Sequence, residues 1–228
     1  MAQMEDVKNA MMDRPIVQED VLNFLRTGQG ELTGKLKELQ DFAIEGRMPI
    51  IPKETVSFLR FFLPILNPKR ILEVGTCIGF SAGLMASVTD AQIVTIDRYK
   101  LMIDRARKNF EEMGYTDRIT LLEGDAEMLL PALDSTFDFI FLDCAKSKYI
   151  KFLPDCLRLM NPGAVLVIDD IFQAGTIFDD PELVRHKRRK IYEGLNELLN
   201  TVYADPTLTA TSLPLGDGLL LVRSNREP

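Results

Sequence analysis

The sequence predicts an α/β fold in which a mixed sheet of seven strands carries helices on both faces. From Arg70 onward, short β-branched apolar runs alternate with amphipathic segments, which is the pattern of parallel βαβ units. The last two runs are separated only by Gly216, Asp217 and Gly218, a turn too short for a parallel crossover, so they must form an antiparallel hairpin. The chain of 228 residues, 46% hydrophobic and 27% charged, is typical of one globular domain spanning residues 1–228.

The first residues, to about 67, predict a helical cap that precedes the sheet. Apolar residues recur with a helical period in 21–28, 31–46 and 53–66, and Gly28, Gly46 and Pro64 are expected to break the helices. Residues from about 70 to 228 are then expected to form the core. Its strands are predicted at 70–75, 92–97, 118–124, 137–143, 164–170, 209–215 and 218–224. Its helices are predicted from about Ser81, over Lys100–Met113, after Lys148 and after Pro181.

Composition excludes several classes of protein. The N-terminal stretch is acidic in places and has no continuous apolar block, and no segment offers about 18 uncharged apolar residues, so secretion and membrane spanning are disfavoured. Cys77, Cys144 and Cys156 form no CxxC pair and fit a reducing compartment, so a cytoplasmic location is expected. The net charge of −7 argues against general coating of nucleic acid, but residues 185–190 alone carry five positive charges.

Carboxylates follow each of the five predicted parallel strands. They are Glu73, Asp97, Asp125 with Glu127, Asp143, and Asp169 with Asp170. A single acid after a strand is usually a helix cap, but capping is a poor explanation for five in register. Because ligands of such sheets bind outside the carboxyl ends of the strands, the sequence predicts an acidic binding site there.

The first strand end has the features of a nucleoside site without a phosphate cradle. Gly75 and Gly79 permit a tight turn before a helix, but the middle glycine of GxGxxG is missing, and Glu73 would repel phosphates and attract an ammonium. Asp97 follows at the distance expected of an acid that binds ribose hydroxyls. S-adenosylmethionine, an adenosine derivative with a cationic tail, fits these features better than NAD.

The segments EVGTCIGFSAGLMA, TID, GDAEMLLPAL, FIFLDCAK and LVIDDI, in this order, resemble the metal-dependent O-methyltransferases that include the catechol and caffeoyl-CoA enzymes. The resemblance spans about residues 38–223 and implies a Rossmann-like class I methyltransferase fold. Within this family the chain is similar to bacterial tRNA 5-hydroxyuridine methyltransferases in FAIEGRMPIIPKET, RHKRRK and PLGDGLLLVRS.

The resemblance implies a role for each residue of the cofactor site. Met48 and Ile50 would line the methionine end of S-adenosylmethionine, and Glu73, Gly75 and Ser81 would hold its amino acid moiety. Asp97 would bind the ribose, Asp125 and Ala126 the adenine, and Asp143 would also contribute to this site. By pattern alone Met48 and Ile50 would be core residues.

Asp143, Asp169 and Asp170 are predicted to bind a metal ion. If the fourth and fifth strands are neighbours, these carboxylates converge and need a cation between them. All-oxygen ligands favour Mg²⁺, with Mn²⁺ or Ca²⁺ as substitutes. The family usually has Asn where this chain has Asp170, which should change the strength of binding or the preferred ion. Lys146 matches the catalytic lysine of the family, and the resemblance implies that its neutral form takes the proton of the acceptor hydroxyl, with the metal depressing its pKa.

Three functions remain open at this stage. Arg185, Lys187, Arg188 and Arg189 are expected in a helix beside the acceptor opening and could bind RNA phosphates, so one hypothesis is methylation of 5-hydroxyuridine at the wobble position of the tRNA anticodon loop. A second is a small-molecule enzyme for catechol or caffeoyl-type phenols, which predicts an aromatic-walled pocket. A third is a nucleoside-binding or scaffold protein without turnover. The family also implies a homodimer formed through the N-terminal helices.

Overall fold

The computed structural model describes residues 17–28 and 30–225, so the first 16 residues of the predicted helical cap lie outside the described part. Seven strands form one sheet in the order β3-β2-β1-β4-β5-β7-β6. The strands are β1 (Arg70–Val74), β2 (Gln92–Asp97), β3 (Ile119–Glu123), β4 (Phe137–Leu142), β5 (Met160–Ile168), β6 (Leu208–Leu213) and β7 (Leu219–Ser224). β1 to β5 are parallel, and β7 pairs antiparallel with both β5 and β6. The predicted mixed sheet with its terminal hairpin is therefore confirmed.

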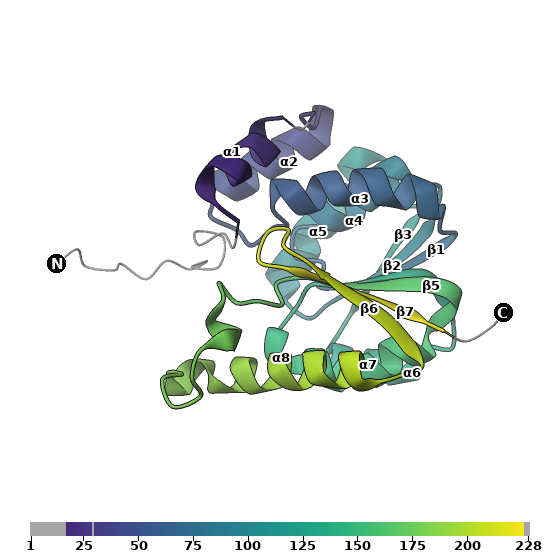
Figure 1. Cartoon of the computed structure of the whole chain (residues 1–228). Helices are drawn as coiled ribbons and strands as arrows, with labels where there is room; N and C mark the ends of the chain where they lie inside the picture. The colour runs from purple at the N-terminus through teal and green to yellow at the C-terminus, as the bar shows by residue number, and fades with distance from the viewer. Residues whose placement is uncertain (1–16, 29, 226–228) are drawn as a thin grey trace.

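Helices cover both faces of this sheet (Figure 1). They are α1 (Glu19–Thr27), α2 (Gly34–Glu45), α3 (Lys53–Leu66), α4 (Phe80–Val88), α5 (Lys100–Met113), α6 (Ala126–Ala132), α7 (Tyr149–Arg158) and α8 (His186–Ala204), with the short 3-10 segments η1 (Lys146–Lys148) and η2 (Thr176–Phe178). The helices α3, α4 and α5 lie on one face, and α6, α7 and α8 lie on the other. Within the described residues, no helix is both long enough and apolar enough to cross a membrane.

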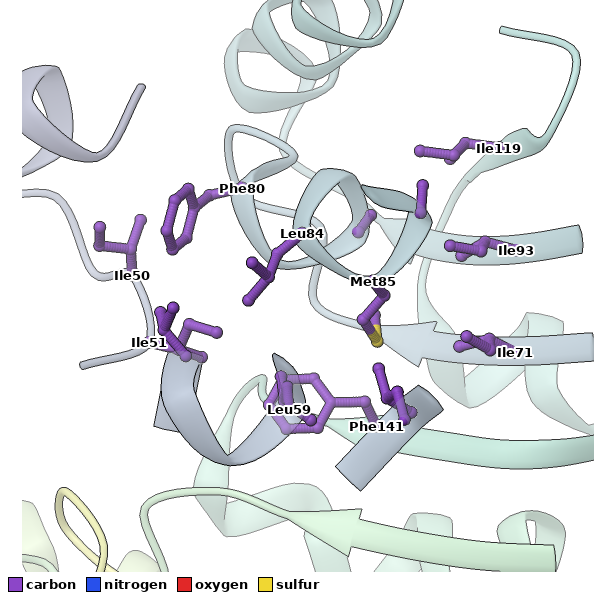
Figure 2. Packing of buried hydrophobic residues seen from close by; sticks show 14 of the residues in the cluster. Ile50, Ile51, Leu59, Ile71, Phe80, Leu84, Met85, Ile93, Ile119 and Phe141 are labelled. Carbon is purple, nitrogen blue, oxygen red and sulfur yellow. The ribbon is translucent and has the colours of Figure 1, made fainter. Parts of the chain in front are cut away.

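Alternation along the strands builds two hydrophobic cores, one on each face. On β4, Phe139 and Phe141 pack toward α3 and α4, whereas Ile140 and Leu142 join the core under α7 and α8. Figure 2 shows the first of these cores, in which Leu59 of α3 and Met85 of α4 meet the sheet. Because side chains of a strand alternate between faces, the nearly continuous apolar runs in the sequence supply both cores at once.

Three local expectations are wrong. Pro64 does not break its helix, because it lies in the last turn of α3, which ends at Leu66 before the left-handed Asn67. The long helix after Pro181 begins only at His186, so Arg185, which was expected within it, precedes it. The Asp180 carboxylate accepts the N–H of Glu182 and closes a separate turn before this helix. The helix α6 was not expected.

Candidate active site

The register of the sheet brings the predicted acids together at one edge. The main-chain N–H of Asp143 donates to the Val74 carbonyl at 3.0 Å, and that of Asp169 donates to the Leu142 carbonyl at 3.0 Å. The ends of β1, β4 and β5 are therefore level, and the fourth and fifth strands are neighbours as the metal prediction required. A cavity of about 650 Å³ opens at this edge, which is within the usual size of a small-molecule pocket.

Most of the predicted site residues line this cavity. They are Ile50, Gly75, Ser81, Asp97, Asp125, Ala126, Asp143, Lys146, Asp169 and Asp170. Glu73 and Met48 are described but are not among the lining residues. Met48 is half-buried, and its sulfur lies 4.0 Å from a guanidinium nitrogen of Arg105.

Glu73 is fully buried behind the loop that follows β1. Its carboxyl oxygens accept hydrogen bonds from the hydroxyls of Ser81 and Thr95, both at 2.5 Å, and Thr95 is also hydrogen-bonded to Thr76 at 2.6 Å. Burial raises the pKa of Glu73 to about 8, and the two hydroxyls oppose that shift. The carboxyl group thus fixes the loop from behind, and Thr76 and Thr95 are parts of this network that the sequence reasoning missed.

Gly75 is needed because the loop passes directly over the end of β4. Its φ is +112°, and a Cβ built there would lie 1.8 Å from the carbonyl oxygen of Asp143. This contact brings the main chain of the loop against the acid end of the neighbouring strand. The glycine signal in the sequence therefore marks a close approach between two parts of the site.

Asp97 at the end of β2 is oriented entirely by main-chain donors. Its Oδ2 accepts the N–H of Cys77 at 2.9 Å, and its Oδ1 accepts the N–H groups of Arg98 and Tyr99 at 2.7 and 2.9 Å. Asp125 has a capping role as well, since it accepts the N–H of Glu127 at the start of α6. That bond and the guanidinium of Arg98 lower the pKa of Asp125.

Lys146 lies between two of the predicted metal ligands. Its Nζ is 2.8 Å from Asp143 Oδ1 and 2.9 Å from Asp170 Oδ2. Burial works to lower the pKa of Lys146, but Asp143, Tyr149 and Asp170 outweigh it, and the pKa rises well above 10.5. The charged form of Lys146 is favoured here because two carboxylates lie on its ammonium. The neutral form that the family resemblance implies was expected only beside a bound metal ion, so that expectation stays a prediction.

The acids of β5 carry more negative charge than their surroundings neutralise. Asp169 is buried and its Oδ1 accepts the N–H of Asp170 at 2.8 Å. Burial, then Asp170 and Asp143, raise the pKa of Asp169 well above 3.8. Burial also raises the pKa of Asp170, although Lys146 opposes it.

The donor type and the charge of this cluster fit a hard divalent cation, since all the nearby ligand atoms are oxygens and their acids are incompletely neutralised. Within the described residues, however, no group of three His, Cys, Asp or Glu side chains is arranged to hold a metal ion. The ammonium of Lys146 lies between Asp143 and Asp170, where such a cation would be expected. A metal ion would therefore have to compete with Lys146.

Asp217 is an acid that the sequence reasoning treated only as part of a turn. It lies between β6 and β7, is buried, and accepts the N–H of Ala174 at 2.6 Å. Burial raises the pKa of Asp217 to about 7, and that hydrogen bond opposes the shift. Its position on a loop that meets the end of β5 could be found only from the pairing of β7 with β5.

Comparison with known proteins identifies the family. A family model described as O-methyltransferase matches residues 29–225. The chain belongs to this O-methyltransferase family. It is 27% identical over 217 residues to "Probable caffeoyl-CoA O-methyltransferase 1" of Dictyostelium discoideum, covering 89% of this chain and 90% of that protein. It is 29% identical over 177 residues to caffeoyl-CoA O-methyltransferase 1 of Eucalyptus globulus, covering 73% and 71%.

Solved structures of methyltransferases share the fold. The SAH-bound Podospora anserina methyltransferase superposes on this O-methyltransferase with a TM-score of 0.80 at 24% identity, covering 98% of both chains. TomG of Streptomyces achromogenes, an O-methyltransferase in complex with SAM, gives a TM-score of 0.79 at 22% identity, covering 91% and 99%. These likenesses confirm the Rossmann-like fold predicted from the sequence.

Proposed function

We propose that the protein transfers the methyl group of S-adenosylmethionine to the 5-hydroxyl of a wobble uridine in tRNA, with a divalent metal ion, giving 5-methoxyuridine. The relatives support an O-methyltransferase of the caffeoyl-CoA type. The observation that carries the tRNA assignment is the exposed basic segment 185–190 at the start of α8, a helix that packs on η1, which contains Lys146.

The position of this segment follows from α8. Gly194 of α8 packs on η1, where a Cβ would lie 3.5 Å from the carbonyl of Ser147, the residue after Lys146. The helix begins at His186, so its basic end lies about 12 Å along the axis from that contact. An anticodon loop that placed its base in the cavity could therefore bring its phosphates to Arg185, Lys187, Arg188 and Arg189, which are all exposed.

The cofactor would bind over the ends of β1, β2 and β3. Asp97, already aimed by three N–H groups, would accept the ribose hydroxyls, and the adenine would lie near Asp125 and Ala126. Gly75 and Ser81 would flank the methionine moiety, near Ile50. Glu73 would act through Ser81 and the loop, because its own carboxyl group is buried behind them.

When bound, S-adenosylmethionine would supply the methyl group to the acceptor oxygen, and Nζ of Lys146, in its neutral form, would take the hydroxyl proton. Asp143, Asp169 and Asp170 would hold Mg²⁺, with Mn²⁺ or Ca²⁺ as substitutes. When bound, the ion would supply charge that lowers the pKa of the acceptor hydroxyl and of Lys146, and would fix the acceptor oxygen. To act as the base, Lys146 must leave its two carboxylates and lose one proton to solvent before the acceptor hydroxyl is deprotonated.

The second candidate is methylation of a small catechol or caffeoyl-type phenol, favoured by the names of the curated relatives. It requires aromatic walls, and the aromatic residues that line the cavity are Phe80, Tyr99 and Phe152. Two further expectations remain predictions. One is cytoplasmic location. The other is a homodimer through the N-terminal helices, supported by the exposed Phe24 of α1 and Phe61 and Ile65 of α3.

Replacement of Arg185, Lys187, Arg188 and Arg189 by Ala separates the two candidates. We expect methylation of tRNA from a strain lacking this gene to fall about 100-fold or more at 0.15 M salt, and catechol turnover to stay within about twofold. A matched control replaces Lys69, Arg107, Lys108 and Arg223 by Ala, which removes the same charge from exposed positions elsewhere. Undiminished tRNA methylation by the first variant, or equal loss in both, would contradict the tRNA assignment.

A further inference from the structure

The turn between β6 and β7 reaches across to the loop that follows β5. The carboxylate of Asp217 accepts the N–H of Ala174 at 2.6 Å through Oδ1. The main-chain carbonyl of Asp217 accepts the N–H of Phe172 at 2.9 Å, and that of Gly218 accepts the N–H of Ile171 at 3.2 Å. Three successive hydrogen bonds thus join a hairpin turn to a loop more than forty residues earlier.

The loop that they hold has an unfavourable backbone conformation. Asp170, Gln173 and Ala174 have φ values of 56°, 51° and 55°, in the left-handed region that residues with a Cβ rarely adopt. Within the loop, the side-chain amide of Gln173 donates to the carbonyl of Asp170 at 3.1 Å. A conformation of this kind persists only where its surroundings enforce it.

The same loop places an acid of the candidate active site. Asp170 begins the loop, and its carboxylate lies 2.9 Å from Nζ of Lys146. Ile171, the next residue, is fully buried. The ring of Phe172 packs so closely on Gly218 that a Cβ there would lie 2.2 Å from it. The direction of the Asp170 side chain therefore depends on how the hairpin turn holds residues 171–174.

We propose that Asp217 is a positioning residue for methyl transfer, whose carboxylate holds residues 170–175 in the conformation that presents Asp170 to Lys146. The proposal rests on the functions proposed above for Lys146 and Asp170. Asp217 itself does not line the cavity and acts through Ala174. Its Oδ2 has no hydrogen-bond partner among the described residues, so the bond to the Ala174 N–H is made through Oδ1 alone.

Replacement of Asp217 by Ala and by Asn tests the proposal. We expect Asp217→Ala to lower kcat about 10-fold or more, because the acceptor site is displaced, while the affinity for S-adenosylmethionine changes less than about twofold. Asp217→Asn keeps an acceptor for the Ala174 N–H and should restore most of kcat. Ala174→Gly removes the penalty of the left-handed backbone, so in the Asp217→Ala background it should recover part of kcat.

Hydrogen exchange of the Ala174 amide gives a readout that does not depend on which molecule accepts the methyl group. It should exchange about 10-fold faster or more in Asp217→Ala and at the native rate in Asp205→Ala. Asp205 is a matched control, since its carboxylate accepts the N–H of Thr207 just before the start of β6, whereas Asp217 follows the end of that strand.

Unchanged exchange in Asp217→Ala, or equal loss of kcat in the Asn variant, would overturn the proposal. Loss of cofactor affinity together with kcat would also overturn it, by showing a general structural role. A wild-type enzyme that methylates neither tRNA nor catechols would refute the proposed function, and the exchange result would still show whether the Asp217 carboxylate holds the loop of residues 170–175.

Discussion

The acids at the ends of β1 and β2 accept hydrogen bonds from neutral donors, whereas two acids at the ends of β4 and β5 pair with one ammonium group. Glu73 is held by two hydroxyls, and Asp97 by three main-chain N–H groups. Asp143 and Asp170 instead share Lys146, and the pKa of the buried Asp169 is raised well above 3.8 by burial and by these neighbouring acids.

The difference indicates that the two halves of the site have different roles. The β1–β2 half satisfies its polar groups internally, so it is preorganised for a cofactor and needs no added charge. The β4–β5 half gathers three acids around one cationic group, and the pKa values of Asp169 and Asp170 are raised there, which suits a region proposed to bind a metal ion. If the two halves are separable, a substitution in one half should leave the function of the other half intact.

The largest effect is expected at Lys146. Replacement by Ala should lower kcat about 10²–10⁴-fold, the range for loss of a general base, with the dissociation constant of S-adenosylmethionine nearly unchanged. Labelled methyl transfer and calorimetry measure the two quantities. Lys148→Ala is the control, since its ammonium pairs with Glu127 instead of the β4 and β5 acids. A kcat within tenfold of wild type would rule out Lys146 as the base.

A smaller effect is expected when the metal affinity of the β5 end is weakened. Asp169→Asn should raise the Mg²⁺ concentration for half-maximal turnover about 10–100-fold, while the β1–β2 half still binds cofactor. Chelation of wild-type enzyme should abolish turnover reversibly. Asp179→Asn, an exposed acid further along the same connection, should leave the Mg²⁺ dependence unchanged. Full turnover in the presence of chelator would show that the acids after β5 do not hold a metal ion needed for the reaction.

The sequence alone predicted the topology well, because its signals are local. Alternating apolar runs predict the strands, and the Gly-Asp-Gly turn predicts the antiparallel pair. Gly75 predicts a tight turn, and its φ of +112° in the structure is one that residues with a side chain rarely adopt. These properties belong to a few consecutive residues, so no long-range knowledge is needed to infer them.

The failures of the sequence reasoning concern contacts between distant segments. The ammonium of Lys146 lies between Asp143 and Asp170, two acids that reach it from different strand ends. The surroundings of Glu73 include Thr95 of the next strand, a contact that no local pattern predicts. The start of α8 was placed too early, because Pro181 resembles a first-turn proline while Asp180 closes a separate turn. Burial and pairing across the sheet decide these cases, and neither is visible in the local pattern.

The smallest effect on turnover, and a distinct effect on stability, is expected at Glu73. The pKa of Glu73 in the folded protein is about 8, against an ordinary value of 4.5. The folded state therefore retains a proton that the unfolded state has lost, and the stabilisation present below pH 4.5 declines as the pH rises through 8. A shift of this size corresponds to at most about 5 kcal/mol.

Glu73→Gln removes this titration while its amide can still hydrogen-bond to the hydroxyls of Ser81 and Thr95. The difference in unfolding free energy, variant minus wild type, should therefore become more positive between pH 5.5 and pH 9, as measured by urea denaturation at each pH. Glu127→Gln, an exposed acid at the start of α6, serves as the control and should show no such trend. A flat difference for Glu73→Gln would mean that Glu73 is ionised in the folded protein. The β1 end would then carry a buried negative charge, and the contrast with the β4–β5 half would be lost.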